Sequence, residues 1–83
     1  MPDGKPDVVA LMEHLAKAIV EAPEEVSVEA FEENGQTVLE LVAAEEEVGR
    51  LIGRHGRTAR SLRTIMNAAA LRTRKRYQLE IVE

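Results

Sequence analysis

Two glycines spaced three apart, Gly53 and Gly56, mark the stretch of this chain whose pattern suggests chemistry. Without a Cβ, both allow a sharp turn in which backbone N–H groups approach an anion closely. A helix beginning after Gly56 would direct the positive end of its dipole to the same place. The basic and titratable side chains around this turn are Arg54, His55, Arg57 and Arg60. The pattern predicts an anion clamp suited to phosphate.

The first element expected to support this turn is a helix that opens at Pro6 and Asp7. Proline suits a first turn, and an Asp carboxylate accepts bonds from free N–H groups. Apolar residues then recur at helical spacing, and this buried face consists of Val8, Leu11, Met12, Leu15 and Ile19. Pro23 ends the helix.

Two strands are predicted next, joined by a tight hairpin. Val26, Val28 and Ala30 alternate with more polar residues, which is typical of a strand. Asn34-Gly35 is a strong hairpin signal, because both residues tolerate positive φ. The second strand covers residues 37–43, and the side chains expected on one face of it are Leu39, Leu41 and Ala43.

The second half of the chain changes to helical spacing. Three acidic residues, 45–47, favour a helix start, and a short apolar face of Val48, Leu51 and Ile52 stops at Gly53. A long helix is predicted from about Arg57 to Lys75. Its expected buried side consists of Ala59, Leu62, Ile65, Met66 and Ala69. Alternation of Tyr77, Leu79 and Ile81 indicates a last strand.

The expected fold is therefore α+β, in the order α-β-β-α-α-β. A three-stranded sheet would be covered on one face by three helices. The 83 residues suffice for one domain, expected over residues 7–83 after an N-terminal tail of residues 1–6.

Charge is distributed very unevenly along the chain. Residues 1–47 hold thirteen acidic and two basic residues, a net charge of −11, whereas residues 48–83 hold nine basic and two acidic residues, a net charge of +7. The overall charge of −4 therefore conceals a cationic region around the predicted clamp. A phosphate backbone responds to this local field.

The stretch from Leu51 to Leu62 resembles the signature of KH domains, in which an aliphatic-Ile-Gly-x-x-Gly-basic-Thr core precedes a helix. The matching residues are Leu51, Ile52, Gly53, Gly56, Arg57, Thr58, Arg60 and Leu62. The element order corresponds to the type II arrangement. The length, the Asn-Gly hairpin and the run from Gly56 to Arg63 are similar to the small stand-alone bacterial KH proteins of the KhpA family. This resemblance covers essentially the whole chain.

The resemblance implies binding of single-stranded RNA without catalysis. The residues it assigns to the RNA site are Ile52, Gly53, Arg54, His55, Gly56, Arg57, Thr58 and Arg60. The loop would clamp the backbone of about four nucleotides. Ile52, with Leu41 or Val42, would line the groove that receives the bases. The family also implies a post-transcriptional regulator or RNA chaperone that forms a homodimer, or a heterodimer with a larger KH protein (KhpB, also called Jag or EloR).

Other classes of function are less well supported by the residues. Gly49 to Thr58 lacks the Lys of a P-loop, and two histidines offer little material for a catalytic or metal site. We expect no enzyme and no cofactor. No apolar run approaches a membrane span, there is no cysteine, and the first residues lack signal-peptide order, so a cytoplasmic location without membrane contact is expected. The alternative left open is a protein–protein adaptor whose acidic half recruits a basic partner and whose RNA binding is incidental.

Overall fold

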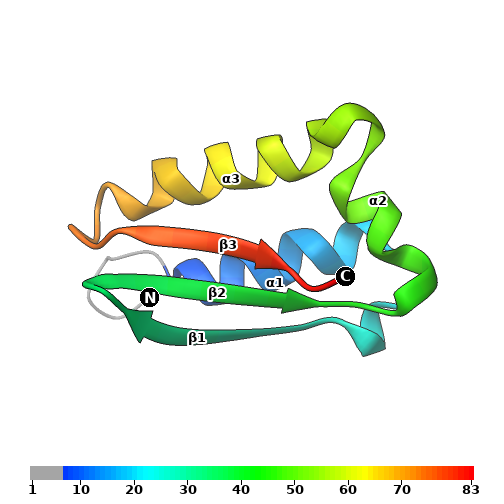
Figure 1. Ribbon diagram of the computed structural model, residues 1–83, viewed down its shortest axis with the longest axis horizontal. Coiled ribbons are helices and arrows are strands. Elements are labelled where there is room, and N and C mark those ends of the chain that lie inside the picture. The colour runs from blue at the N-terminus through cyan, green and yellow to red at the C-terminus, as the bar shows by residue number, and fades with distance from the viewer. Residues whose placement is uncertain (1–6) are drawn as a thin grey trace.

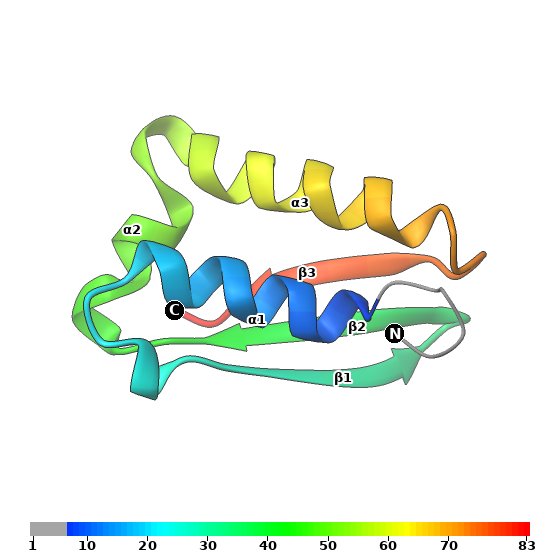
Figure 2. The same cartoon turned by 180° about the vertical axis from the view of Figure 1, so that it is seen from behind.

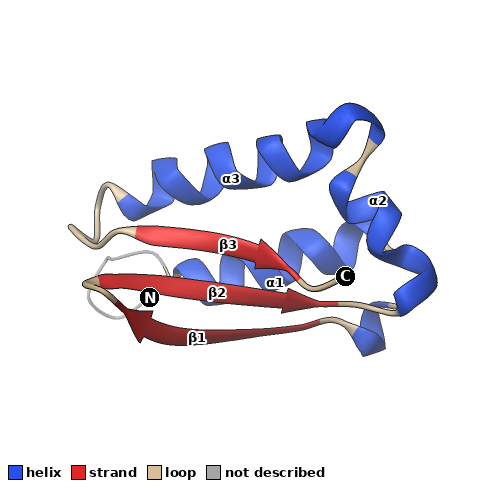
Figure 3. Cartoon of the chain, viewed as in Figure 1, coloured by secondary structure: helices blue, strands red, loops and turns tan. Residues whose placement is uncertain are grey.

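The computed structural model describes residues 7–83. Its helices and strands are α1 (Val8–Ile19), β1 (Ser27–Glu33), β2 (Gln36–Val42), α2 (Val48–Ile52), α3 (Arg57–Ala70) and β3 (Tyr77–Ile81). Short 3-10 turns occupy Pro23–Glu25, Glu45–Glu47 and Arg54–Gly56 (Figures 1 and 3). The predicted α+β class and element order are confirmed. The predicted tail and the role of Pro6 at the first helix lie outside the described residues.

The three strands form one sheet in the order β1-β2-β3. β1 and β2 are antiparallel, with Glu33 opposite Gln36 at the hairpin end, whereas β2 and β3 are parallel. The predicted turn is present, because Asn34 and Gly35 both have positive φ, 51° and 81°. The parallel pair requires a long crossover, which α2 and α3 provide.

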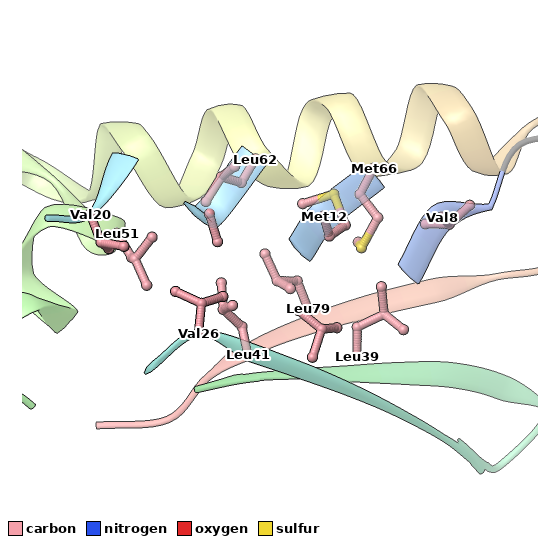
Figure 4. Close-up of a cluster of buried hydrophobic side chains, with 12 residues drawn as sticks. Val8, Met12, Val20, Val26, Leu39, Leu41, Leu51, Leu62, Met66 and Leu79 are labelled. Carbon is pink, nitrogen blue, oxygen red and sulfur yellow. The ribbon is translucent and has the colours of Figure 1, made fainter. Parts of the chain in front are cut away.

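The helices lie on one side of this sheet and enclose the core between them (Figures 1 and 2). Figure 4 shows Met12 of α1 and Leu62 and Met66 of α3 above Leu39, Leu41 and Leu79 of the sheet. These side chains belong to a single buried cluster that also includes Leu51 of α2. The apolar stripe of each helix therefore meets the same face of the sheet.

α1 starts as the sequence predicts. The carboxylate of Asp7 accepts a hydrogen bond from the backbone N–H of Ala10 at 3.0 Å, which satisfies one of the free donors of the first turn. Val8, Met12 and Ala16 are its buried residues. Spacing of four residues brings them onto one face.

Two predictions for the long helix are wrong. Its α-helical part ends at Ala70 instead of near Lys75, and Ile65 is 42% exposed instead of buried. The chain leaves the helix because the Thr73 hydroxyl donates to the Ala70 carbonyl and accepts the N–H of Lys75. Ile65 faces outward because Leu62, Met66 and Ala70 already fill the side turned to the sheet.

The sheet face away from the helices is acidic. Glu29, Glu40 and Glu80 are direct neighbours across the three strands. They alternate with the core residues Leu39, Leu41 and Leu79, so they point to the opposite face. This glutamate row gives the open face a negative field that disfavours a phosphate backbone.

None of the helices formed by residues 7–83 combines the length and apolarity needed to cross a membrane.

Candidate functional site

The glycine loop is held between two helices that are anchored in the core. Leu51 of α2 is fully buried, and Ala59 and Leu62 of α3 are each only 4% exposed. The loop itself projects beyond these anchors at one end of the molecule, where α2 turns into α3 (Figure 1). This arrangement fixes the loop's backbone while leaving its side chains accessible.

The backbone of the loop depends on residues that tolerate positive φ. Gly53 has φ 76° and ψ 170°, a combination that is essentially restricted to glycine. His55 (φ 58°) and Gly56 (φ 72°) both adopt the left-handed region, in which His is enriched among non-glycine residues. The Gly56 N–H donates to the Gly53 carbonyl at 3.0 Å and closes the turn. Turns of this kind make concave surfaces lined by N–H groups.

Gly53 is also required for packing. A Cβ built on it would lie 2.3 Å from Thr58 Oγ1 and 2.8 Å from the Thr58 backbone nitrogen. The first turn of α3 therefore rests directly on the Gly53 backbone. Gly56 at the N-cap of α3 has no side chain that could cap the helix, and of its first N–H groups that of Arg57 donates to the Arg54 carbonyl within the turn.

The structure brings the predicted basic and titratable side chains together around this turn. The exposed ones are Arg54, His55, Arg57 and Arg60. Arg60 lies near the loop, because its Nη2 is 3.5 Å from the carbonyl oxygen of His55. Thr58 is half-buried against Gly53. A turn at a helix N-terminus, surrounded by exposed arginine side chains, favours a phosphate group.

The groove prediction is partly wrong. Leu41 is fully buried within the core cluster, so it cannot line a groove for bases. Val42 points to the other face because strand side chains alternate, and it lines a hollow with Val48 of α2 and Val82 after β3. Ile52 is half-buried and lies one helical turn beyond Val48.

One residue that positions the site was missed by sequence reasoning. We expected residues 45–47 to favour the start of a helix through charge. A helical turn does begin at Glu45 and leads into α2 at Val48. In addition, the buried Glu47 carboxylate accepts hydrogen bonds from the backbone N–H groups of Glu21 and Ala22, the latter at 2.9 Å. It ties the end of α1 to the start of α2. Nothing in three consecutive glutamates distinguishes this one.

A second missed contact connects α3 to the sheet. Arg63 Nη2 donates to the Leu79 carbonyl oxygen of β3 at 3.2 Å. This bond occupies an acceptor on the otherwise unpaired edge of β3. Arg63 thus has a structural role, which its position among the other arginines of α3 does not indicate in the sequence.

Among residues 7–83, no three His, Asp or Glu side chains form a group that could hold a metal ion. The glutamates of the open face are arranged in a row across the strands and not around a common centre.

Comparison with known proteins identifies the family. A model of the KH domain of KhpA and KhpB proteins matches residues 9–81, which is nearly the whole chain. The chain belongs to the KhpA/KhpB KH-domain family. The resemblance seen in the sequence is thereby confirmed. This member of the family has the element order, the parallel β2–β3 pair and the glycine loop described above.

Curated relatives support this assignment over most of their length. The RNA-binding protein KhpA of Treponema pallidum is 44% identical over 88% of this chain and 91% of its own length. That of Borreliella burgdorferi is 40% identical over 90% and 92%. That of Thermotoga maritima is 47% identical over 70% and 77%. No solved structure matches the chain significantly. The expectation that the protein is not an enzyme is confirmed by this family.

Proposed function

We propose that this protein binds single-stranded RNA in the cytoplasm at the Gly53–Gly56 loop and the N-terminus of α3. The observation that carries the proposal is the loop geometry. Positive φ at Gly53, His55 and Gly56 shapes a turn on the first residues of α3. The residues we assign to the site are Ile52, Gly53, Arg54, His55, Gly56, Arg57, Thr58 and Arg60. Curated members of the family are named RNA-binding proteins, which supports the same conclusion.

Each part of this site has a physical role in the proposal. N–H groups of the turn and of the start of α3 donate to one phosphate, and Arg57 and Arg60 hold the neighbouring phosphates. Bases of about four nucleotides extend toward Ile52. The glutamate row repels RNA from the open sheet face, so that binding is confined to the cationic end. Such a site contacts the phosphate backbone of RNA more than it reads the base sequence.

The first test is a variant in which Arg54 and His55 are both replaced by aspartate. We expect RNA binding to weaken at least tenfold, because two repulsive charges replace two attractive groups at the phosphate. Fluorescence anisotropy of a labelled single-stranded RNA measures this. For the unmodified protein, two to four phosphate contacts give a slope of log K against log salt of roughly −1.4 to −2.8.

The chain offers a matched control for this variant. His14 and Lys17 are exposed on α1, a different helix from the two that hold the loop, and His14→Asp with Lys17→Asp introduces the same residues and the same change of charge. The control should keep RNA binding within about twofold. If both variants lose binding equally, net charge and not the loop determines affinity, and the proposed site is wrong.

We further propose that the protein acts as a dimer, with a second copy or with a larger KH protein of the KhpB kind, in post-transcriptional regulation or as an RNA chaperone. The outward face of α3 supports this. Ile65 is exposed, and its neighbours on that face, Ser61 and Ala68, are small and exposed. A small-large-small stripe allows two helices to approach closely around a two-fold axis. Two loops on one RNA would then raise affinity by avidity.

Ile65→Glu tests the dimer. Sedimentation equilibrium should show a dimer for the unmodified protein and a monomer for this variant, because a carboxylate would be buried without a partner at the centre of the interface. Folding should be unaffected, since Ile65 is 42% exposed. Thr64→Glu is the control, because Thr64 is exposed one residue away. If the unmodified protein sediments as a monomer at all concentrations, the proposed homodimer is wrong.

The adaptor function is the second candidate, and the open sheet face favours it. The glutamate row lies beside the exposed side chain of Phe31, which is 40% accessible. Acidic and apolar groups together suit a basic protein partner. If cells carrying the Arg54→Asp, His55→Asp variant keep their normal phenotype although RNA binding is lost, the adaptor explains the protein's role.

A further inference from the structure

The turn between α3 and β3 gathers a second group of cations away from the glycine loop. The consecutive residues Arg74, Lys75 and Arg76 are all exposed. They line a hollow together with two amide side chains, Gln36 of β2 and Asn67 of α3. This turn lies at the opposite end of α3 from the glycine loop (Figure 1). The 14 residues of α3 separate the two by about 21 Å.

The backbone of this basic turn is fixed in place. The Thr73 hydroxyl bonds both the Ala70 carbonyl, at 2.7 Å, and the N–H of Lys75, at 3.1 Å. At the other end, the Arg76 carbonyl accepts the N–H of Thr37 at 2.8 Å. Arg74 between them has φ 60°, a conformation that arginine adopts at a cost. Basic residues on a backbone turn that is already fixed lose less conformational entropy on binding than basic residues on a flexible segment.

Helix capping does not account for these charges. The dipole of a helix acts on charges in its last turn, and α3 ends at Ala70. Arg74, Lys75 and Arg76 come four or more residues later, after the chain has turned back toward β3. The exposed Leu71, 81% accessible, borders the same hollow and offers an apolar surface beside the cations.

We propose that this basic turn is a second contact site for single-stranded RNA, used by strands that extend beyond the glycine loop. The inference rests on the RNA binding proposed above. Phosphates contact Arg74, Lys75 and Arg76, and the amides of Gln36 and Asn67 donate to the same strand. With phosphates about 3.4 Å apart in a stacked strand, some six nucleotides span the 21 Å between the sites. A four-nucleotide RNA occupies only the loop, whereas a twelve-nucleotide RNA reaches both.

The test compares oligouridylates of 4 and 12 nucleotides by fluorescence anisotropy across a salt series. The variant is Arg74→Asn with Lys75→Gln, in which asparagine retains tolerance of the left-handed backbone. We expect the variant to bind the 4-mer like the unmodified protein. It should lose at least tenfold in affinity for the 12-mer, and its salt slope should be shallower by about 1.4, which corresponds to two phosphate contacts.

The reciprocal variant, Arg57→Gln with Arg60→Gln, removes the same charge at the loop and should weaken both lengths. Circular dichroism checks that each variant is folded. An Arg74→Asn, Lys75→Gln variant that keeps the affinity and salt slope for the 12-mer overturns the second site, because any length effect then comes from two copies binding through their loops. Absence of 4-mer binding by the unmodified protein, with 12-mer binding lost in the Arg74→Asn, Lys75→Gln variant, would instead leave the turn as the RNA site and refute the loop.

Discussion

Gly53→Ala should lower the free energy of unfolding of this protein by about 2–6 kcal/mol. The backbone at φ 76° and ψ 170° costs a residue with a Cβ roughly 1–3 kcal/mol. The new methyl group would also lie 2.3 Å from Thr58 Oγ1, and relieving such overpacking costs about 1–3 kcal/mol more. Domains of this size have about 4–12 kcal/mol in total. Urea denaturation followed by circular dichroism measures the loss.

Gly56→Ala is the matched control. Gly56 also has positive φ, 72°, but ψ 15° places it in the left-handed helical region, and a Cβ there meets nothing within 4 Å. We expect a loss of only about 1 kcal/mol. Equal losses for the two alanines would mean that the contact with Thr58 does not determine the loop.

The second large effect is expected for Glu47→Ala, which should lower the free energy of unfolding by about 2–3 kcal/mol. The Glu47 side chain is buried, with the residue only 6% exposed, and it accepts two backbone N–H groups from the segment after α1. Removing the carboxylate leaves those donors without their charged acceptor. Bonds to charged groups contribute about 1.5–3 kcal/mol each, and water at the exposed Glu21 end replaces part of the two that are lost. The loss should appear in thermal or urea unfolding.

Glu46→Ala is the control for this variant, because Glu46 is adjacent, has the same charge and is exposed. Its effect should stay within about 0.5 kcal/mol. Glu47→Gln should fall between the two, because an amide oxygen can accept one of the bonds without the charge. Destabilisation of similar size at both glutamates would point to charge in this acidic segment as the cause.

Much of the fold could be predicted because local rules and tertiary structure agree. Apolar spacing placed Val8 and Met12 in the core, and Asn34-Gly35 determined the hairpin. The failures have physical causes. No Gly or Pro follows Ala70, so the sequence contains no stop signal, and Arg74 itself takes the left-handed position that glycine usually occupies. Ile65 lies within one residue of the buried stripe, and periodicity alone does not decide such a boundary position.

For the candidate site, too, local features could be predicted from the sequence and contacts between distant residues could not. The glycine spacing and nearby cations were visible in the sequence because the loop is local. Of the two strand residues predicted as alternatives for the groove, Leu41 or Val42, Leu41 is excluded, and only the sheet's orientation relative to the helices reveals that it faces the core. Two sets of hydrogen bonds join residues distant in sequence: the N–H groups of Glu21 and Ala22 donate to Glu47, and Arg63 donates to the Leu79 carbonyl. No pattern along the chain encodes such contacts.

The measurement that tests the central claim most directly is an NMR titration of the ¹⁵N-labelled protein with a four-nucleotide single-stranded RNA. It reports where on the chain the RNA lies. We predict that the largest amide shifts fall on residues 52–60, with small ones on α1 and on the open sheet face that carries Glu29, Glu40 and Glu80. Shifts concentrated on that open face, with residues 52–60 unchanged, would contradict the account.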